Sequence, residues 1–426
     1  MCEVPGQACY LGRRRRTRMA RIITTLSTLL GLGMTLVLPI YPEGIEPLIL
    51  AFMIACAVAA VFGLADRSAR HELAVMAPWA LALLLGVLVG SLHHGESLQA
   101  IEDVLPYLLF VTGLVAGRGA GAPRRILQLG LWVCVIDSVI SLWLMESFTV
   151  GVRSTFTYYK ITAGLPLVGL YLAAVLRETP EPNAQRRHRA WLGQAILVTT
   201  LVLGLVFSVT RGMMLGGLLM VAVSSYIRRP SQSLLFAALA LLGLLAWSSA
   251  FAEFGVQYFR LGQEGTIVGR FREVEVAWEG FVAAPLFGQG LGALADVDGF
   301  KKAFVHNMAA YHLWKFGLVG STLLVLPLVA IARELRTHNR SLRGHALGAA
   351  AGVVGYLVTC AAYKTYYLVW IYGAVVGASL SHFSGWRLRI KAHAASSSPS
   401  PTNPDPPATA PLRATLAAPA AGPGTI

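Results

Sequence analysis

Charged residues are scarce in this sequence. Only 13% of its 426 residues are Asp, Glu, Lys or Arg, and 55% are hydrophobic, whereas a soluble globular protein carries about 25% charged residues. This scarcity argues against an ordinary soluble enzyme of this length. The formal net charge is nevertheless +14, which in a soluble chain would point to nucleic acid as a partner. The positions of the basic residues explain this charge differently, and we expect no nucleic-acid partner.

Cysteines and metal-binding motifs are also few. The sequence has no HExxH motif, no paired carboxylates at metal-ligand spacing and no glycine-rich phosphate loop before a basic helix. We therefore expect neither a metal nor a cofactor. Of the five cysteines, none forms a pair on an outer face, so no disulfide is predicted. No small-residue cleavage site follows the first apolar block, which favours an uncleaved anchor.

Long apolar blocks are abundant. A segment needs about 20 mostly apolar residues to cross the hydrocarbon core of a bilayer. Blocks that fit occupy residues 22–40, 47–64, 73–92, 104–116, 126–145, 161–176, 191–209, 212–227, 233–252, 308–332, 345–363 and 366–382. The predicted fold class is therefore all-α, a polytopic membrane protein with about 12 transmembrane helices.

The basic residues predict the orientation of these helices. Arginines and lysines gather in every second connection, at residues 13–21, 67–70, 118–125, 177–189, 228–229, 333–343 and 387–413. Because Lys and Arg mark the cytoplasmic side of membrane proteins, both termini are predicted to be cytoplasmic. The predicted parts are a basic cytoplasmic arm (1–21), transmembrane helices 1–9 (22–252), a long outer loop (253–305), transmembrane helices 10–12 (306–391) and a disordered cytoplasmic tail (392–426).

The loop over 253–305 is the one long connection on the predicted outer face, and loops of this length are commonly functional. Residues 270–284 predict an amphipathic helix within it, ended by Pro285 and the glycines of 288–292. Its apolar stripe comprises Phe271, Val274, Trp278, Phe281 and Val282. Such a helix would lie over the outer mouth of the bundle or in the lipid interface. A purely structural plug is the alternative.

Three residues at or within predicted spans are functional candidates. Arg211 separates two apolar runs with almost no loop, and an arginine near hydrocarbon depth is costly unless it meets an anion or a water-filled cavity; snorkelling to headgroups is the alternative. His306, where the long loop re-enters the membrane, suits proton transfer near neutral pH; an interfacial hydrogen-bonding role is the alternative. Asp137 is either a proton-path acid or a structural hydrogen-bonding group.

Other charged residues on the predicted outer face receive simpler interpretations. Lys301 and Lys302 are expected to be a solvated or headgroup-facing pair. Glu102 and Asp103, at an outer helix end, are expected to be solvated. A guanidinium group binds phosphate oxygens bidentately, so arginines can do for a diphosphate what a metal does elsewhere.

Several motifs on the predicted outer face form an ordered series. They are Ser-Val-Thr-Arg-Gly at 208–212, Gly269-Arg270 with Trp278, Pro-Leu-Phe-Gly-Gln-Gly-Leu-Gly at 285–292, and His306-Asn307. This series resembles the O-antigen ligase family, whose superfamily also contains O-antigen polymerases and bacterial protein O-oligosaccharyltransferases. The resemblance covers about residues 150–320, and the predicted number of spans agrees with it across the chain.

The resemblance implies a metal-independent, inverting glycosyltransferase in the cell inner membrane, active on the periplasmic face. The donor would be O-antigen glycan on undecaprenyl diphosphate, and the acceptor would be the lipid A–core oligosaccharide. His306 matches the family histidine proposed as general base, and Arg211 and Arg270 match the arginines proposed to grip the diphosphate. Further candidates for substrate binding are Arg153, Lys160, Arg272, Lys301 and Lys302.

The sequence departs from the family pattern after Arg153, where Tyr158-Tyr-Lys160 stands in place of a common Asn-Pro. Two alternatives share the donor chemistry: an O-antigen polymerase and a protein O-oligosaccharyltransferase. An alternative of another class is a polytopic transporter, which would use Asp137 as a proton site and the long loop as a lid.

Overall fold

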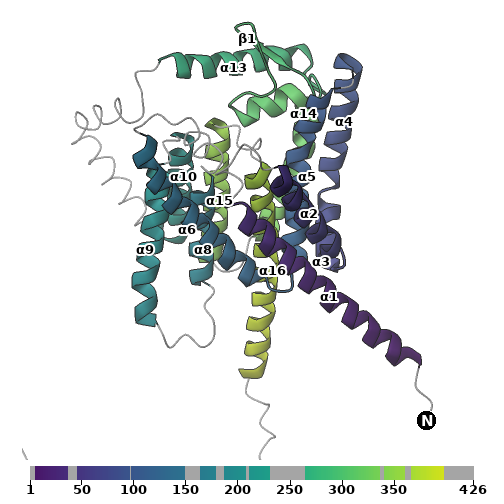
Figure 1. Ribbon diagram of the computed structural model, residues 1–426, viewed down its shortest axis with the longest axis vertical. Coiled ribbons are helices and arrows are strands. Elements are labelled where there is room, and N and C mark those ends of the chain that lie inside the picture. Colours follow the sequence, from purple (N-terminus) through teal and green to yellow (C-terminus); the bar gives the residue numbers. More distant parts are fainter. Residues whose placement is uncertain are drawn as a thin grey trace, which may run out of the picture. The chain divides into compact units, whose positions relative to one another are not determined.

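The computed structural model describes residues 5–36, 46–95, 97–148, 164–178, 187–207, 211–230, 264–335, 340–359 and 366–397. This part of the chain forms thirteen helices and one two-stranded hairpin (Figure 1). The chain divides into two compact units, Met1–Ser384 and Gly385–Ile426. The packing that positions the candidate site lies within the first unit.

Thirteen helices lie in the described part of the chain. In order they are α1 (Pro5–Met34), α2 (Glu46–Gly63), α3 (Arg67–Val75), α4 (Ala77–His94), α5 (Leu98–Gly119), α6 (Pro123–Phe148), α8 (Leu165–Glu178), α9 (Arg187–Phe207), α10 (Arg211–Arg228), α13 (Glu264–Ala283), α14 (Met308–Leu335), α15 (Arg340–Thr359) and α16 (Tyr366–Ser397). Strands β1 (Ala295–Val297) and β2 (Phe300–Lys302) pair antiparallel between α13 and α14.

Five helices in the described part are long and apolar enough to cross a membrane: α4, α5, α14, residues Pro123–Trp143 of α6 and residues Tyr367–Gly385 of α16. Helices α2 and α3 meet at a bend of 108° and make a sixth if they count as one broken span. Shorter apolar stretches lie in α9 and α10. These helices indicate an all-helical, multi-pass membrane protein.

Each apolar block predicted from the sequence falls at least in part on a described helix, except for the block at 233–252, which lies outside the described residues. The block predicted over 73–92 is divided at Met76, where α3 ends and α4 begins. Pro78 lies in the first turn of α4, and a proline fits the first turn of a helix but disrupts its interior. The division therefore follows from this proline.

Helix α14, predicted as one span over 308–332, is broken at Gly317, where φ is 60° and ψ is −165°. This glycine lies against Gly288 of the segment after α13, which also has a positive φ of 69°. A Cβ added to Gly288 would lie 2.6 Å from the backbone nitrogen of Gly317. The two backbones can approach this closely only because neither residue has a side chain.

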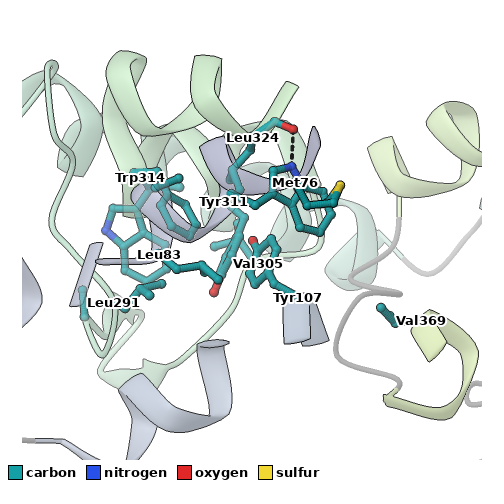
Figure 2. Packing of buried hydrophobic residues seen from close by; sticks show 14 of the residues in the cluster. Met76, Leu83, Tyr107, Leu291, Val305, Tyr311, Trp314, Leu324 and Val369 are labelled. Carbon is teal, nitrogen blue, oxygen red and sulfur yellow. Dashed lines mark hydrogen bonds between the residues drawn. The ribbon is translucent and has the colours of Figure 1, made fainter. Parts of the chain in front are cut away.

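The segment between α13 and the hairpin is fixed to the bundle by backbone hydrogen bonds. The N–H groups of Gln289, Gly290 and Leu291 donate to the carbonyls of Trp314, Lys315 and Gly86, at 2.8, 2.9 and 2.8 Å. Around it, α4, α5 and α14 enclose a buried cluster (Figure 2). Its members include Leu83, Tyr107, Leu291, Tyr311 and Trp314. This cluster anchors the segment that carries the hairpin and His306.

Charged residues gather near both ends of α5. Near its C-terminus, Arg118 bonds Glu72 of α3 and Glu334 of α14, at 3.2 and 2.7 Å; we call this the arginine end. Near its N-terminus, Asp103 pairs with Lys315 of α14 at 2.8 Å. We call the region formed by this pair, α13 and the β-hairpin the hairpin end. Asp103 and Arg118 are about four helical turns apart, or roughly 22 Å.

Candidate active site

A buried carboxylate on α13, that of Glu273, organises the charged groups around His306. The residue is 3% exposed. Its Oε1 accepts a hydrogen bond from Lys302 Nζ at 2.7 Å, and its Oε2 accepts one from the backbone N–H of His306 at 3.0 Å. The same Oε2 lies 2.6 Å from His306 Nδ1. Glu273 therefore holds His306 by both its backbone and its ring.

The ionisation of Glu273 decides which ring nitrogen of His306 carries a proton. Burial alone would raise the pKa of Glu273, but the hydrogen bonds from His306 and Lys302 outweigh it and lower this pKa from 4.5 to about 2. An ionised carboxylate can only accept hydrogen bonds. His306 Nδ1 must therefore be the donor, and the neutral imidazole keeps its lone pair on Nε2.

The second nitrogen of His306 is the one open to an incoming group. The side chain is 33% exposed, and the ring of Phe304 packs edge-on against it, with centroids 5.6 Å apart. Among the residues that the structure describes, none donates to or accepts from Nε2. A histidine fixed through Nδ1 with Nε2 accessible can accept a proton from a bound hydroxyl.

Small residues on α13 bring Glu273 towards His306. Ala277, four residues after Glu273, is fully buried, and Gly280 lies under the ring of Trp314. The side chain of Gln289 donates to the Gly280 carbonyl at 2.8 Å. Residues at positions i, i+4 and i+7 share one helix face, so this face packs on the bundle and carries the carboxylate with it.

The β-hairpin brings Lys302 back to α13. Its turn uses Asp298 and Gly299, with φ of 56° and 80°, and the Gly299 N–H donates to Asp296 Oδ1 at 2.9 Å. Asparagine, aspartate and glycine tolerate this left-handed conformation best. Lys301 is exposed on β2, as expected. The side chain of Lys302 is 37% exposed, in line with the expected solvated pair, and its ammonium group also bonds Glu273.

The two predicted arginines of α13 lie on different sides of the helix. Arg270 is exposed and precedes Glu273 by three residues, so it lies one turn away on a neighbouring part of the helix surface. Arg272 is exposed as well, and it pairs with Glu275 at 2.6 Å and with Asp298 at 3.7 Å. These carboxylates raise the pKa of Arg272. The guanidinium group of Arg272 is thus already paired within the chain.

Arg211 is the first residue of α10. The opposite terminus of this helix lies at the arginine end, because Arg340 Nε donates to the carbonyl of Ile227 at 2.5 Å, and Arg340 begins the helix that follows Glu334. Arg211 therefore starts α10 on the side of the hairpin end. Its side chain lies outside the described residues, as do Arg153 and Lys160 altogether.

The predicted amphipathic helix is confirmed as α13, which begins six residues earlier than expected, at Glu264. Three of the five residues in its predicted apolar stripe are exposed, and the other two, Val274 and Phe281, are half-buried. Phe271, Trp278 and Val282 are 72%, 54% and 58% exposed, and the opposite face, that of Glu273 and Gly280, makes the contacts. The large apolar residues are therefore available to something outside the described chain.

Two features of the hairpin end were not predicted. The first is the role of Glu273, whose only sequence signal is a carboxylate on the helix face that otherwise carries Ala277 and Gly280. The second is the pair of Asp103 and Lys315, both fully buried. The expectation that Asp103 is solvated is wrong; Glu102, its neighbour, is exposed as expected.

The Asp103–Lys315 pair is closed by further hydrogen bonds. Asp103 Oδ2 also accepts from the Gly292 N–H at 3.0 Å, and Lys315 Nζ donates to the Ala293 carbonyl at 2.5 Å. The ammonium group lies 4.6 Å from the ring centroid of Trp314. A lysine within an apolar run requires a buried partner, and this is the signal that could have indicated the pair.

Asp137 of α6 is 1% exposed, and Cys56 and Cys134 are buried free cysteines. Within the described residues, no group of His, Cys, Asp or Glu has an arrangement that could hold a metal ion.

No protein-family model matches the chain, and no curated protein matches it significantly.

Proposed function

We propose that this protein is an O-antigen ligase: it transfers O-antigen glycan from undecaprenyl diphosphate to lipid A–core oligosaccharide on the periplasmic face of the inner membrane. One observation carries the proposal. The His306 imidazole is held by the buried Glu273 through Nδ1 and has no partner on Nε2 among the described residues, and Glu273 itself follows Arg270 by one helical turn on α13, at the opposite end of α5 from Arg118.

The proposed orientation follows from the positive-inside rule. If the arginine end is cytoplasmic, the hairpin end with His306 is periplasmic. About twelve spans would place both termini in the cytoplasm. Arg211, which begins α10 on the side of the hairpin end, would then share the periplasmic face with His306 and Arg270.

In the proposed reaction, Nε2 of His306 takes the proton of an acceptor sugar hydroxyl. The hydroxyl oxygen attacks the anomeric carbon of the donor and forms the new glycosidic bond. The bond from that carbon to the diphosphate oxygen breaks, its electron pair stays with the diphosphate, and the configuration inverts. A positioned base contributes about 10²–10⁴-fold to such a rate, and the ionised Glu273 stabilises the imidazolium ion that forms.

The leaving diphosphate needs positive charge. Arg270 is the described residue that suits this role, with Arg211, Arg153 and Lys160 as further proposed ligands. Guanidinium groups fixed before the reaction stabilise developing charge without reorganisation, and they bind phosphate oxygens in pairs. Lys302 bonds Glu273, and Arg272 pairs with Glu275 and Asp298.

The decisive experiment is transfer in proteoliposomes that contain the purified protein, undecaprenyl-linked glycan and rough lipopolysaccharide. His306→Ala should lower the rate by at least about 10²-fold. Arg270→Gln should also lower it, whereas Arg272→Gln, on the same helix, is the matched control and should remain active. Full activity of His306→Ala would refute the proposal. The transfer activity should also survive EDTA. A loss of activity that Mg²⁺ restores would contradict binding of the diphosphate by arginines alone.

The alternatives differ in acceptor, so the same assay separates them. A polymerase would join the glycan to a second lipid-linked repeat in vesicles that lack lipopolysaccharide. A protein O-oligosaccharyltransferase would modify a protein acceptor instead. A transporter would lose function in Asp137→Asn and tolerate His306→Ala, which is the reverse of what the ligase proposal expects.

A further inference from the structure

The outward face of α13 is an apolar strip with no partner among the described residues. Phe271, Trp278 and Val282 lie at positions i, i+7 and i+11, which share one side of a helix, and each is more than half exposed. Trp278 and Phe281 pack against each other, with ring centroids 5.1 Å apart. The strip lies opposite Glu273 and Gly280, the face that packs on the bundle.

A further exposed apolar residue follows the strip just beyond the end of α13. Leu286, one turn after Val282, is 57% exposed. The backbone there joins α14, because the N–H groups of Leu318 and Val319 donate to the carbonyls of Pro285 and Leu286, at 2.9 and 3.0 Å. Leu318 is itself 49% exposed. The exposed surface of α13 therefore runs directly onto the first turn of α14 after its break.

The same surface then follows one side of α14 along the candidate span. Leu318, Thr322, Val325 and Val329 recur at helical spacing and are all exposed, and none carries a charge. The one hydroxyl among them, that of Thr322, donates to the Leu318 carbonyl at 2.7 Å, so it needs no water. A side of a spanning helix with this composition faces lipid.

We infer that the outward face of α13 lies in the bilayer leaflet at the hairpin end, in contact with phospholipid acyl chains. A row of exposed large apolar side chains is unfavourable in water. An amphipathic helix in the membrane interface instead buries its apolar side by about 5–10 Å. Tryptophan prefers this depth. The pair of Arg272 and Glu275, 51% and 56% exposed, borders the strip and neutralises its own charge.

The inference sets the depth of the candidate site. Glu273 lies on the face of α13 opposite the strip, so a helix that rests in the leaflet holds His306 beside the headgroups. That is the level at which the phosphates of a lipid-linked diphosphate lie. The membrane contact itself does not rest on the proposed glycan transfer, and it can be tested in vesicles that contain no substrate.

The test is fluorescence quenching in proteoliposomes, with single labelled cysteines in a full-length protein whose native cysteines are replaced. Trp278→Cys and Val282→Cys probe the strip. Thr322→Cys on α14 is the lipid-facing control, and Asp298→Cys in the hairpin turn, with a side chain 67% exposed, is the water-facing control. Nitroxide-labelled phospholipid quenches labels in the leaflet, and iodide quenches labels in water.

Labels at 278 and 282 should be quenched by the nitroxide lipid, as the label at 322 is, and shielded from iodide. Quenching by iodide as strong as at 298 would overturn the inference. Shielding from both quenchers would overturn it as well, because it would mean that protein covers the strip. Lipid quenching at 322 confirms in each preparation that the protein is folded into the bilayer, which keeps the other two results interpretable.

Discussion

Charged side chains are arranged differently near the two ends of α5. At the arginine end, Arg118 is 7% exposed and lies between the carboxylates of Glu72 and Glu334, with the hydroxyl of Ser384 3.3 Å away. At the hairpin end, both carboxylate oxygens of Glu273 accept hydrogen bonds, and one of its partners is a histidine whose second nitrogen has no partner among the described residues.

We call an ion pair closed when its charged groups contact only other parts of the protein, and open when one of its groups can also reach a ligand. Closed pairs hold helices together, whereas an open pair can act on a ligand. The hairpin end contains both, because the Asp103–Lys315 pair is closed and lies in the segment that supports α13. The comparison therefore predicts that closed pairs govern stability and that the Glu273–His306 pair governs activity.

The largest effect is expected from breaking the closed pair at the hairpin end. Lys315→Met leaves Asp103 buried without its cation, which should lower the free energy of unfolding by about 3–5 kcal/mol. Thermal unfolding in detergent measures this loss. The double variant Asp103→Asn with Lys315→Met should recover much of the stability, because no buried charge remains. Equal losses in the single and double variants would show that the pair is not the stabilising unit.

The second-largest effect is expected when the Glu273–His306 pair is changed. Glu273→Gln keeps the shape of the side chain but removes its negative charge, so the ring loses the anion that holds its proton on Nδ1 and stabilises the imidazolium ion. The transfer rate should fall on the order of 10²-fold, with a smaller effect on the KM of the acceptor. Glu275→Gln, on the exposed side of the same helix, is the matched control and should keep its rate.

A readout independent of transfer sharpens this prediction. Diethyl pyrocarbonate acylates an unprotonated imidazole nitrogen, so His306 should react readily in the wild-type protein and more slowly in Glu273→Gln. Equal reactivity in both proteins would contradict the assignment of the tautomer.

The pH dependence is expected to be smaller and has a definite sign. The pKa of Glu273 is lower in the folded protein, about 2, than its ordinary 4.5. Its stabilising contribution is therefore fully present above about pH 4.5 and is lost as the pH falls towards 2. The difference in unfolding temperature between the wild type and Glu273→Gln should not shrink from pH 7 to about 5. A difference that already shrinks in that range would contradict an ionised, hydrogen-bonded Glu273.

The smallest effect is expected at Arg272. Its partners are exposed carboxylates, and exposed ion pairs contribute little. Arg272→Gln should change the transfer rate by no more than about twofold, measured beside Arg270→Gln under the same conditions. A loss at Arg272 as large as at Arg270 would show that it binds the donor and that the two sides of α13 act together.

Apolar periodicity and block length predicted most of the helices, because these depend on local sequence. The break at Met76 could have been predicted from Pro78. The break at Gly317 could not, because it depends on Gly288, a residue far away along the chain.

The same distinction holds for the site. His306 and Arg270 stand out by residue type and position, and the structure places Arg270 one helical turn before Glu273, the residue that bonds His306. The partner of His306 is 33 residues away along the chain, and Glu273 resembles any other acid on a helix until α13 and the hairpin are folded together. The burial of Asp103 likewise requires knowing that Lys315 packs against it.

The contact between Gly288 and Gly317 joins the segment after α13 to α14 through a space too small for a single methyl group. Alanine at either position would push α13 away from the start of the spanning part of α14, and Leu286 would separate from Leu318. If α13 rests in the leaflet as inferred, the depth of the His306 imidazole in the membrane thus depends on glycine at both of these positions.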